Sequence, residues 1–196
     1  TYNGHIKYAY AADTGGNIYR ISAGTAGSQK DIQDADPSMN EWIMTKIASL
    51  GCDDPDPSGG DCTGTNPSNR KFLFGPDVVK IPETEYMAIL LGSGDREKPL
   101  TDYGSAYQVP NYFFSIVDQP LTPDWLDDGD DDTCDNEGVI CMEGLTTLTL
   151  AGIAGLGEEE TLSQWGWKFA MDSHEQVVSG ALTIANDVSF STHIPA

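Results

Sequence analysis

A strand–turn–strand pattern near the start of the sequence limits the possible folds more than any other segment. Alternating side chains predict one strand over Tyr8–Ala12 and a second over Asn17–Ser22. The intervening Asp13–Gly16 ends in two glycines, which tolerate the positive φ angles of a tight hairpin turn. Ile18 and Ile21 are predicted to cover the same core as the inward face of the first strand. The first predicted element is therefore an antiparallel β-ribbon.

The composition fits a domain made of strands and turns. A chain of 196 residues is long enough to bury the core of one domain. It contains 21 Gly and 11 Pro, and 39% of its residues are hydrophobic, which leaves much of the length to loops. We expect further strands in Trp42–Ser49 (a short helix is the alternative), Arg70–Ile81, Glu85–Gly92, Tyr112–Asp118, Leu145–Ala151, Gly166–Met171, Gln176–Ile184 and Val188–His193. Glu85–Gly92 is expected to be a buried central strand because Met87–Leu91 is continuously apolar.

Three polar stretches, 23–40, 52–69 and 120–143, interrupt this succession of strands. Strands are predicted on both sides of each stretch, so we interpret them as loop insertions within a single domain, residues 1–196. A β-propeller blade takes about 40–50 residues and a closed ring about 4–8 blades, so the remaining chain suffices for roughly three blades. The predicted fold class is all-β: antiparallel blades of a partial propeller with long, disulfide-pinned insertions. A small open sandwich is the alternative.

The strong negative charge restricts the possible partners. The chain has 31 Asp and Glu against 10 Lys and Arg, a net charge of −21. Phosphate backbones would be repelled, so nucleic acid is excluded as a partner, and anionic lipid surfaces are disfavoured. No apolar run approaches the about 20 residues that cross a bilayer, so no membrane insertion is expected. Cations, above all Ca²⁺, suit such a surface. The alternative is that the acidity only keeps a secreted protein soluble.

The four cysteines form two close pairs, each enclosing a polar loop. The pairing Cys52–Cys62 and Cys134–Cys141 is favoured among the three possible connectivities. A zinc site is the competing interpretation, but the chain has no Cys-x-x-Cys and no His beside either pair. Disulfides would place the protein in an oxidising compartment, namely the periplasm, the cell surface or the medium.

The candidate metal site lies in the third insertion. Asp128, Asp130 and Asp132 alternate, so their three carboxylates can point to one centre, and Asp135 follows them. Calcium takes six to eight oxygen ligands from a flexible loop of this kind. The EF-hand pattern is absent, and a solvated acidic loop is the alternative interpretation.

Catalytic patterns are weak, and we predict no catalytic residues and no enzymatic activity. The three histidines are far apart, and no Gly-x-Ser-x-Gly elbow occurs. Gly92–Gly94 follows a buried strand but is interpreted as a strand-end turn with local ion pairs rather than a phosphate loop. Trp165 and Trp167 alternate, so they are expected on one face of a strand, where packing between blades is favoured over carbohydrate binding.

Four segments in this order resemble the C-terminal β-propeller domain of type IV pilus biogenesis and tip-adhesin proteins of the PilC/PilY type. They are residues 10–21, 87–100, 111–118 and 166–195. The first, Tyr-Ala-Ala-Asp-Thr-Gly-Gly-Asn-Ile-Tyr-Arg-Ile, is similar to the family's Tyr-Ala-Gly-Asp-x-x-Gly-Asn-Leu-Trp-Arg-Phe. Each motif is weak alone, but the ordered set spans nearly the whole chain and is fairly specific.

The resemblance implies an extracellular protein of the pilus tip, exported through the periplasm, that promotes pilus assembly and attaches cells to surfaces. The implied partners are minor pilins of the tip, a receptor on a host or abiotic surface, and the remainder of the same polypeptide. Some family members carry a calcium loop just before the first hairpin. Asn3 and Gly4 match that loop, but Lys7 stands where its last carboxylate is expected, so this site is not carried over.

Two other functions compete with an adhesin. A quinoprotein-like, calcium-dependent propeller enzyme would need adjacent cysteines in many cases, and the chain has none. A purely structural filament subunit would pair with its neighbours through open strand edges. The receptor, the oligomeric state and what completes the ring do not follow from the sequence.

Overall fold

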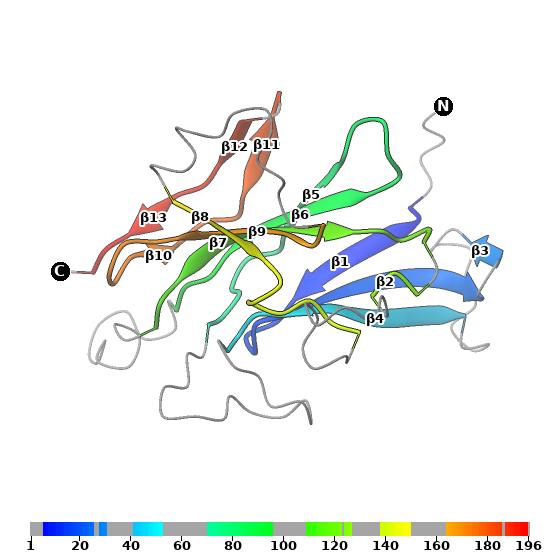
Figure 1. Ribbon diagram of the computed structural model, residues 1–196, viewed down its shortest axis with the longest axis horizontal. Helices are drawn as coiled ribbons and strands as arrows, with labels where there is room; N and C mark the ends of the chain where they lie inside the picture. Colours follow the sequence, from blue (N-terminus) through cyan, green and yellow to red (C-terminus); the bar gives the residue numbers. More distant parts are fainter. Residues whose placement is uncertain are drawn as a thin grey trace.

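The computed structural model describes residues 6–25, 28–30, 41–52, 70–95, 109–122, 124–126, 138–149, 164–185 and 187–195. Every regular element in this part of the chain is a strand, so the predicted all-β class is confirmed (Figure 1). None of the residues described belongs to a helix capable of crossing a membrane. The strands are β1 (Tyr8–Ala12), β2 (Asn17–Thr25), β3 (Ser28–Lys30), β4 (Trp42–Ser49), β5 (Asp77–Lys80), β6 (Met87–Gly92), β7 (Tyr112–Asp118), β8 (Thr146–Leu148), β9 (Gly166–Ala170), β10 (Gln176–Val177), β11 (Leu182–Ile184), β12 (Asp187–Ser189) and β13 (Thr192–His193).

The predicted first ribbon forms one end of a four-stranded N-terminal sheet. β2 pairs antiparallel with β1 on one side and with β4 on the other, and β3 pairs with the end of β2. The turn between β1 and β2 is held by Asp13, whose Oδ1 accepts hydrogen bonds from the amides of Gly15 and Asn17, both at 2.9 Å. An aspartate that caps its own turn in this way fixes the hairpin locally. The strand interpretation of Trp42–Ser49 is confirmed.

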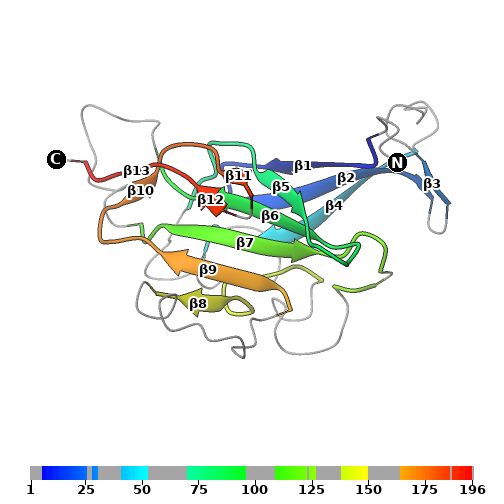
Figure 2. The ribbon, with the colours of Figure 1, turned by 90° about the horizontal axis from the view of Figure 1, so that it is seen from above.

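The second sheet has five strands in the order β5-β6-β7-β9-β8, which lie side by side in Figure 2. β6 lies between β5 and β7, as expected for its continuous apolar run. The predicted antiparallel pairing is confirmed for the other strand pairs of the described residues, whereas β8 pairs parallel with β9 at one edge of this sheet. β8 and β9 are neighbours in this sheet. A parallel pair such as this one needs a long crossover connection rather than a hairpin.

The two sheets pack face to face around the main core. In Figure 1 the five-stranded sheet lies between the N-terminal sheet and the short C-terminal ribbons β10–β13 and β11–β12. The core between the two sheets contains Ile18, Ile47, Ala48, Leu50, Phe72, Ile89, Leu91, Phe114, Ile116, Trp125, Leu126, Ile140, Met142, Leu145 and Trp165. A second cluster, with Leu90, Phe113 and Val177 at its centre, lies on the other face of the five-stranded sheet. Burial of these two faces is the main stabilising contribution.

Two predictions of which sheet face a side chain occupies are wrong. Ile18 is fully buried, but Ile21 pairs with Ala9 and therefore lies on the opposite face of the sheet from Tyr10. Trp165 packs in the main core whereas Trp167 packs in the second cluster, so the two indoles lie on opposite faces. The cause is Gly166 between them, whose φ of 118° breaks the alternation of the strand.

Several predicted boundaries also change. Residues 71–74 do not form a strand, because their main-chain groups form isolated hydrogen bonds instead of a continuous ladder with another strand. The Phe72 amide donates to the Asp13 carbonyl, and the Lys71 carbonyl accepts from the Gly94 amide. The segments 176–184 and 188–193 each divide into two short strands of different ribbons. The stretches 23–40 and 120–143 are not pure loops. β2 extends into the first, and the second carries core side chains at both ends.

Cys52 and Cys141 are both disulfide-bonded. Cys62 and Cys134 lie outside the described residues, so the pairing Cys52–Cys62 and Cys134–Cys141 stays a prediction. The sheets of the described residues form no closed ring (Figure 1), and the number of blades also stays a prediction.

Candidate functional site

The predicted calcium ligands Asp128, Asp130, Asp132 and Asp135 all lie outside the described residues. Within the part of the chain that the structure describes, no group of three or more His, Cys, Asp or Glu side chains is placed to hold a metal ion. The calcium site therefore stays a prediction, and the candidate functional site of the described residues lies elsewhere.

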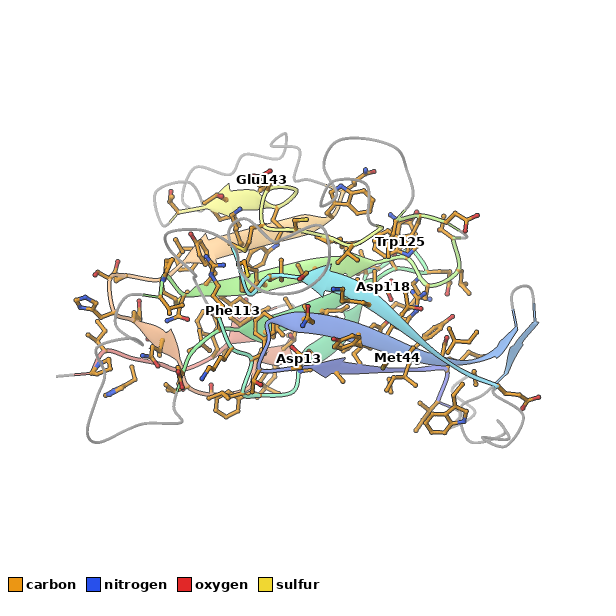
Figure 3. The ribbon with its side chains drawn as sticks, turned by 90° about the horizontal axis from the view of Figure 1, so that it is seen from below. Asp13, Met44, Phe113, Asp118, Trp125 and Glu143 are labelled. Carbon is orange, nitrogen blue, oxygen red and sulfur yellow. The ribbon has the colours of Figure 1, made fainter. Side chains whose placement is uncertain are left out.

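A buried polar cluster joins the two sheets. Asp118, at the end of β7, has no exposed surface and accepts two hydrogen bonds from the N-terminal sheet. The Tyr10 hydroxyl of β1 donates to Oδ2 at 2.8 Å, and Nη1 of Arg20 on β2 donates to Oδ1 at 2.7 Å. Arg20 and Tyr10 are directly paired neighbours in the ladder, so both side chains reach the same carboxylate. Figure 3 shows Asp118 where the two sheets meet.

Burial sets the protonation properties of this cluster. Loss of solvation raises the pKa of Asp118 above its usual range, although the Arg20 charge and the Tyr10 hydrogen bond act in the opposite direction. Burial also raises the pKa of Tyr10, and the adjacent Asp118 charge and hydrogen bond add to this effect. The Tyr10 hydroxyl therefore keeps its proton, and its role is to donate to the carboxylate.

The raised Tyr10 pKa predicts a loss of stability in alkali. Above pH 10 a tyrosine of the unfolded chain releases its proton, whereas Tyr10 of the folded protein retains it, so the free energy of unfolding falls as pH rises. The slope from this one group is about 1.4 kcal/mol per pH unit. Urea unfolding of the protein and of the Tyr10→Phe variant between pH 9 and 11 measures it, and the variant should show a shallower decline. Parallel declines would contradict the role given to Tyr10.

A groove of about 580 Å³ opens beside this cluster. It lies between the β1 end of the N-terminal sheet and the β5–β6 hairpin of the second sheet, and Tyr10 contributes to both the groove and the cluster. Its lining residues are Ile6, Lys7, Tyr8, Ala9, Tyr10, Val78, Lys80, Glu85, Met87 and Leu121. A concave site of this volume with mostly apolar walls and a few polar groups is typical of ligand-binding sites.

The segment Gly92–Gly94 has a structural role. The Gly94 amide donates to the Lys71 carbonyl and the Val177 amide donates to the Ser93 carbonyl, both at 3.0 Å. A Cβ atom on Gly92 or Gly94 would collide with Val177, at 2.4 Å and 2.6 Å. These glycines let β10 approach β6, and the Gly94 amide is already used within the protein. Most of the charged turn predicted after Gly94, with its local ion pairs, lies outside the described residues and stays a prediction. Asp95 forms an ion pair with the distant Lys71, and their charged atoms are 3.1 Å apart.

No family model and no curated protein matches this sequence. In structure the chain is similar to the crystal structure of the Pseudomonas aeruginosa PilY1 C-terminal domain, with a TM-score of 0.58 and 15% identity. The chain has a PilY1-like fold. The match covers 96% of this chain but only 42% of the PilY1 chain, so this sequence spans less than half of that structure. At this identity the similarity shows the fold of the PilY1 domain and leaves its function as a proposal.

Sequence reasoning missed both Asp118 and the groove. From the sequence, Asp118 is only the last residue of a predicted strand within the 111–118 motif, and Arg20 is only part of the first motif. One signal was present: an arginine in the middle of a predicted half-buried strand needs a carboxylate partner. Nothing in the sequence indicates which of the 31 acidic residues it meets.

Proposed function

We propose that this chain is a non-enzymatic binding and assembly module of a type IV pilus tip protein, located outside the cell. The observation that carries the proposal is the PilY1-like fold over 96% of the chain. The order of the four sequence segments that resemble the family also supports it, because the resemblance is not confined to one motif.

The architecture suits a display scaffold. The two sheets and the C-terminal ribbons bury separate faces of β6 and β7, so the centre of the domain is rigidly packed. The predicted working surfaces are the insertions 23–40, 52–69 and 120–143, together with the groove beside Tyr10. Binding residues on loops positioned by a rigid scaffold are a common arrangement. The proposed partners are tip minor pilins, a surface receptor and the remainder of the polypeptide.

Immunogold electron microscopy of the producing cell tests the location. An antibody raised against this chain should label the tips of surface filaments. Label confined to the cytoplasm, or spread along the filament shaft, would refute a tip module, and the second pattern would favour a filament subunit.

A charge substitution tests the third insertion as a surface for attachment. The sequence alone predicts that deletion of residues 120–143 leaves the fold intact. This prediction is wrong, because the deletion would remove four side chains of the main core: Trp125, Leu126, Ile140 and Met142. The fourfold change of Asp128, Asp130, Asp132 and Asp135 to Asn keeps the core and both cysteines. We expect the melting temperature measured without calcium to stay within about 2 °C, because the change removes no apolar side chain, while cell attachment falls severalfold. Normal attachment by this variant would remove the loop from the proposed function.

A further inference from the structure

Strand β4 forms one edge of the N-terminal sheet. In the described residues it is the longest strand at a sheet edge, with eight residues against five in β1, four in β5 and three in β8. Its C-terminal end is covered by Ile140, whose carbonyl accepts from the Ser49 amide and whose amide donates to the Ile47 carbonyl. Figure 1 shows β4 along the lower edge of the sheet. Residues 42–46 therefore present an edge at which another strand can pair.

The hydrogen-bond pattern directs alternate main-chain groups of β4 away from the sheet. The Asp13 amide donates to the Asn17 carbonyl at 3.0 Å, so the main chain of Asn17 points to β1. Directions alternate along a strand, so Arg20 points to the other side and bonds its β4 partner Thr45. The amides and carbonyls that point outward from β4 are therefore those of Trp42, Met44 and Lys46. Among the described residues these outward groups have no hydrogen-bond partner.

Apolar side chains accompany this edge. Three consecutive residues, Trp42, Ile43 and Met44, are 50%, 41% and 70% exposed. Natural edge strands are usually protected from pairing by charges, by proline or by short length. Residues 42–46 contain no proline and no acidic residue, although the chain has a net charge of −21. Their one charged side chain is Lys46, which forms no ion pair with any described residue. The usual protection against pairing is thus weak at this edge.

The edge is complementary to itself about Met44. The outward groups belong to every second residue from 42 to 46, so a two-fold rotation about Met44 brings each of them opposite an outward group of a second copy. Met44 then lies opposite Met44, and Trp42 of each copy lies opposite Lys46 of the other. A cation beside an indole ring is a favourable contact. Because no charge meets a like charge in this arrangement, the edge suits a second copy of the chain better than a strand of unrelated sequence.

We propose that two copies of this chain associate through β4, antiparallel about a two-fold axis at Met44. The same edge is used by both copies, so the association closes at two and does not form a filament. One short strand pair buries less than the about 1,200–2,000 Å² of a standard interface, so we expect a Kd on the order of 10–100 µM. Two chains of charge −21 repel each other, so added salt should tighten the dimer. The inference depends on β4 alone and does not require the pilus function.

Sedimentation equilibrium of the intact protein tests the proposal. The average mass should rise reversibly with concentration, from that of one copy toward that of two. The Kd should fall severalfold between about 0.05 M and about 0.5 M NaCl, because the repulsion between the two chains is screened. A constant mass of one copy up to about 0.5 mM protein, where a dimer of the expected strength would predominate, would overturn the proposal. A mass that passes that of two copies would also overturn it.

Charge substitutions at Met44 test the two-fold axis, because this exposed residue (Figure 3) would face itself. Met44→Glu and Met44→Lys each place like charges opposite one another, so each variant alone should lose at least tenfold in self-affinity. An equimolar mixture of the two should form a mixed dimer at least as tight as the native one. The control is Ile184→Glu on β11, where Ile184 is 65% exposed, and its Kd should not change. Native self-affinity of Met44→Glu, or a mixture that stays monomeric, would contradict the assignment.

Amide hydrogen exchange separates strand pairing from contact through side chains alone. In a single copy the Thr45 amide bonds to β2, whereas the amides of Met44 and Lys46 point outward and should exchange rapidly. Pairing should slow the outward amides in proportion to the fraction of paired chains, about tenfold when nine-tenths are paired. NMR spectra at low and high protein concentration measure the rates residue by residue. Unchanged rates for Met44 and Lys46 in a sample whose mass shows a dimer would exclude pairing through β4.

Discussion

Asp118→Asn is expected to lower the free energy of unfolding by about 3 kcal/mol. Removal of one partner from a buried ion pair leaves the other charge uncompensated, at a typical cost of about 3–5 kcal/mol. The lower end applies because the Arg20 side chain retains 13% exposure while Asp118 has none. The amide keeps the size of the carboxyl group, so the loss reports the charge and its hydrogen bonds rather than a cavity. Urea unfolding at pH 7, followed by tryptophan fluorescence, measures it.

The control for this variant is Asp95→Asn. Its partner Lys71 lies at 3.1 Å, and the two side chains are 21% and 23% exposed, so less than about 1 kcal/mol should be lost. The triple variant Tyr10→Phe, Arg20→Met and Asp118→Leu, which leaves no buried donor of the cluster without its acceptor, should recover most of the lost stability, since well-packed apolar side chains often replace a buried ion pair without cost. If Asp118→Asn lost no more stability than Asp95→Asn, the cluster would not join the sheets.

Gly166→Ala is expected to cost about 3 kcal/mol or more, through two effects on the same residue. Gly166 has φ of 118°, a conformation that is strained for any residue with a Cβ, by about 1–3 kcal/mol. The new Cβ would also lie 2.0 Å from the Ser115 carbonyl oxygen, which belongs to the backbone of β7 and cannot turn aside. Overpacking of this kind adds about 1–3 kcal/mol. Thermal unfolding by circular dichroism measures the loss.

Gly75→Ala provides the matched comparison. It makes the same chemical change, but nothing lies within 4 Å of the added methyl group and the backbone has no positive φ. Its melting temperature should equal that of the native protein within about 2 °C. Similar melting temperatures for the two variants would show that the twist of β9 at Gly166 is not required.

The locally encoded parts of the fold were predictable from the sequence. Tyr8–Ala12, Trp42–Ser49 and Tyr112–Asp118 have the predicted limits as strands, because each has a periodic or continuous apolar pattern bounded by polar or turn residues. The Asp13 turn formed where the glycines indicated. The central position of Met87–Gly92 in its sheet also followed from its apolar run.

The remaining features depend on contacts between distant residues. The expectation that Ile21 covers the same core as Ile18 is wrong because the two residues are three apart, an odd spacing that places them on opposite faces of a strand. The expectation that Trp165 and Trp167 share a face is wrong because the positive φ of Gly166 between them breaks the alternation of side chains. The Arg20–Asp118 pair joins residues 98 positions apart, and the groove exists only because the β1 and β5–β6 edges meet in three dimensions. No local pattern encodes such juxtapositions.

The proposed pilus-tip function is tested most directly by counting surface pili and attached cells in strains that produce the Gly166→Ala or the Gly75→Ala protein. The first variant should destabilise the domain by about 3 kcal/mol or more and the second should leave its stability unchanged, so the comparison separates the domain from the rest of the polypeptide. We expect few pili and weak attachment with Gly166→Ala, and native levels of both with Gly75→Ala. Native piliation and attachment in a Gly166→Ala strain whose domain is shown to be unfolded would contradict the proposal.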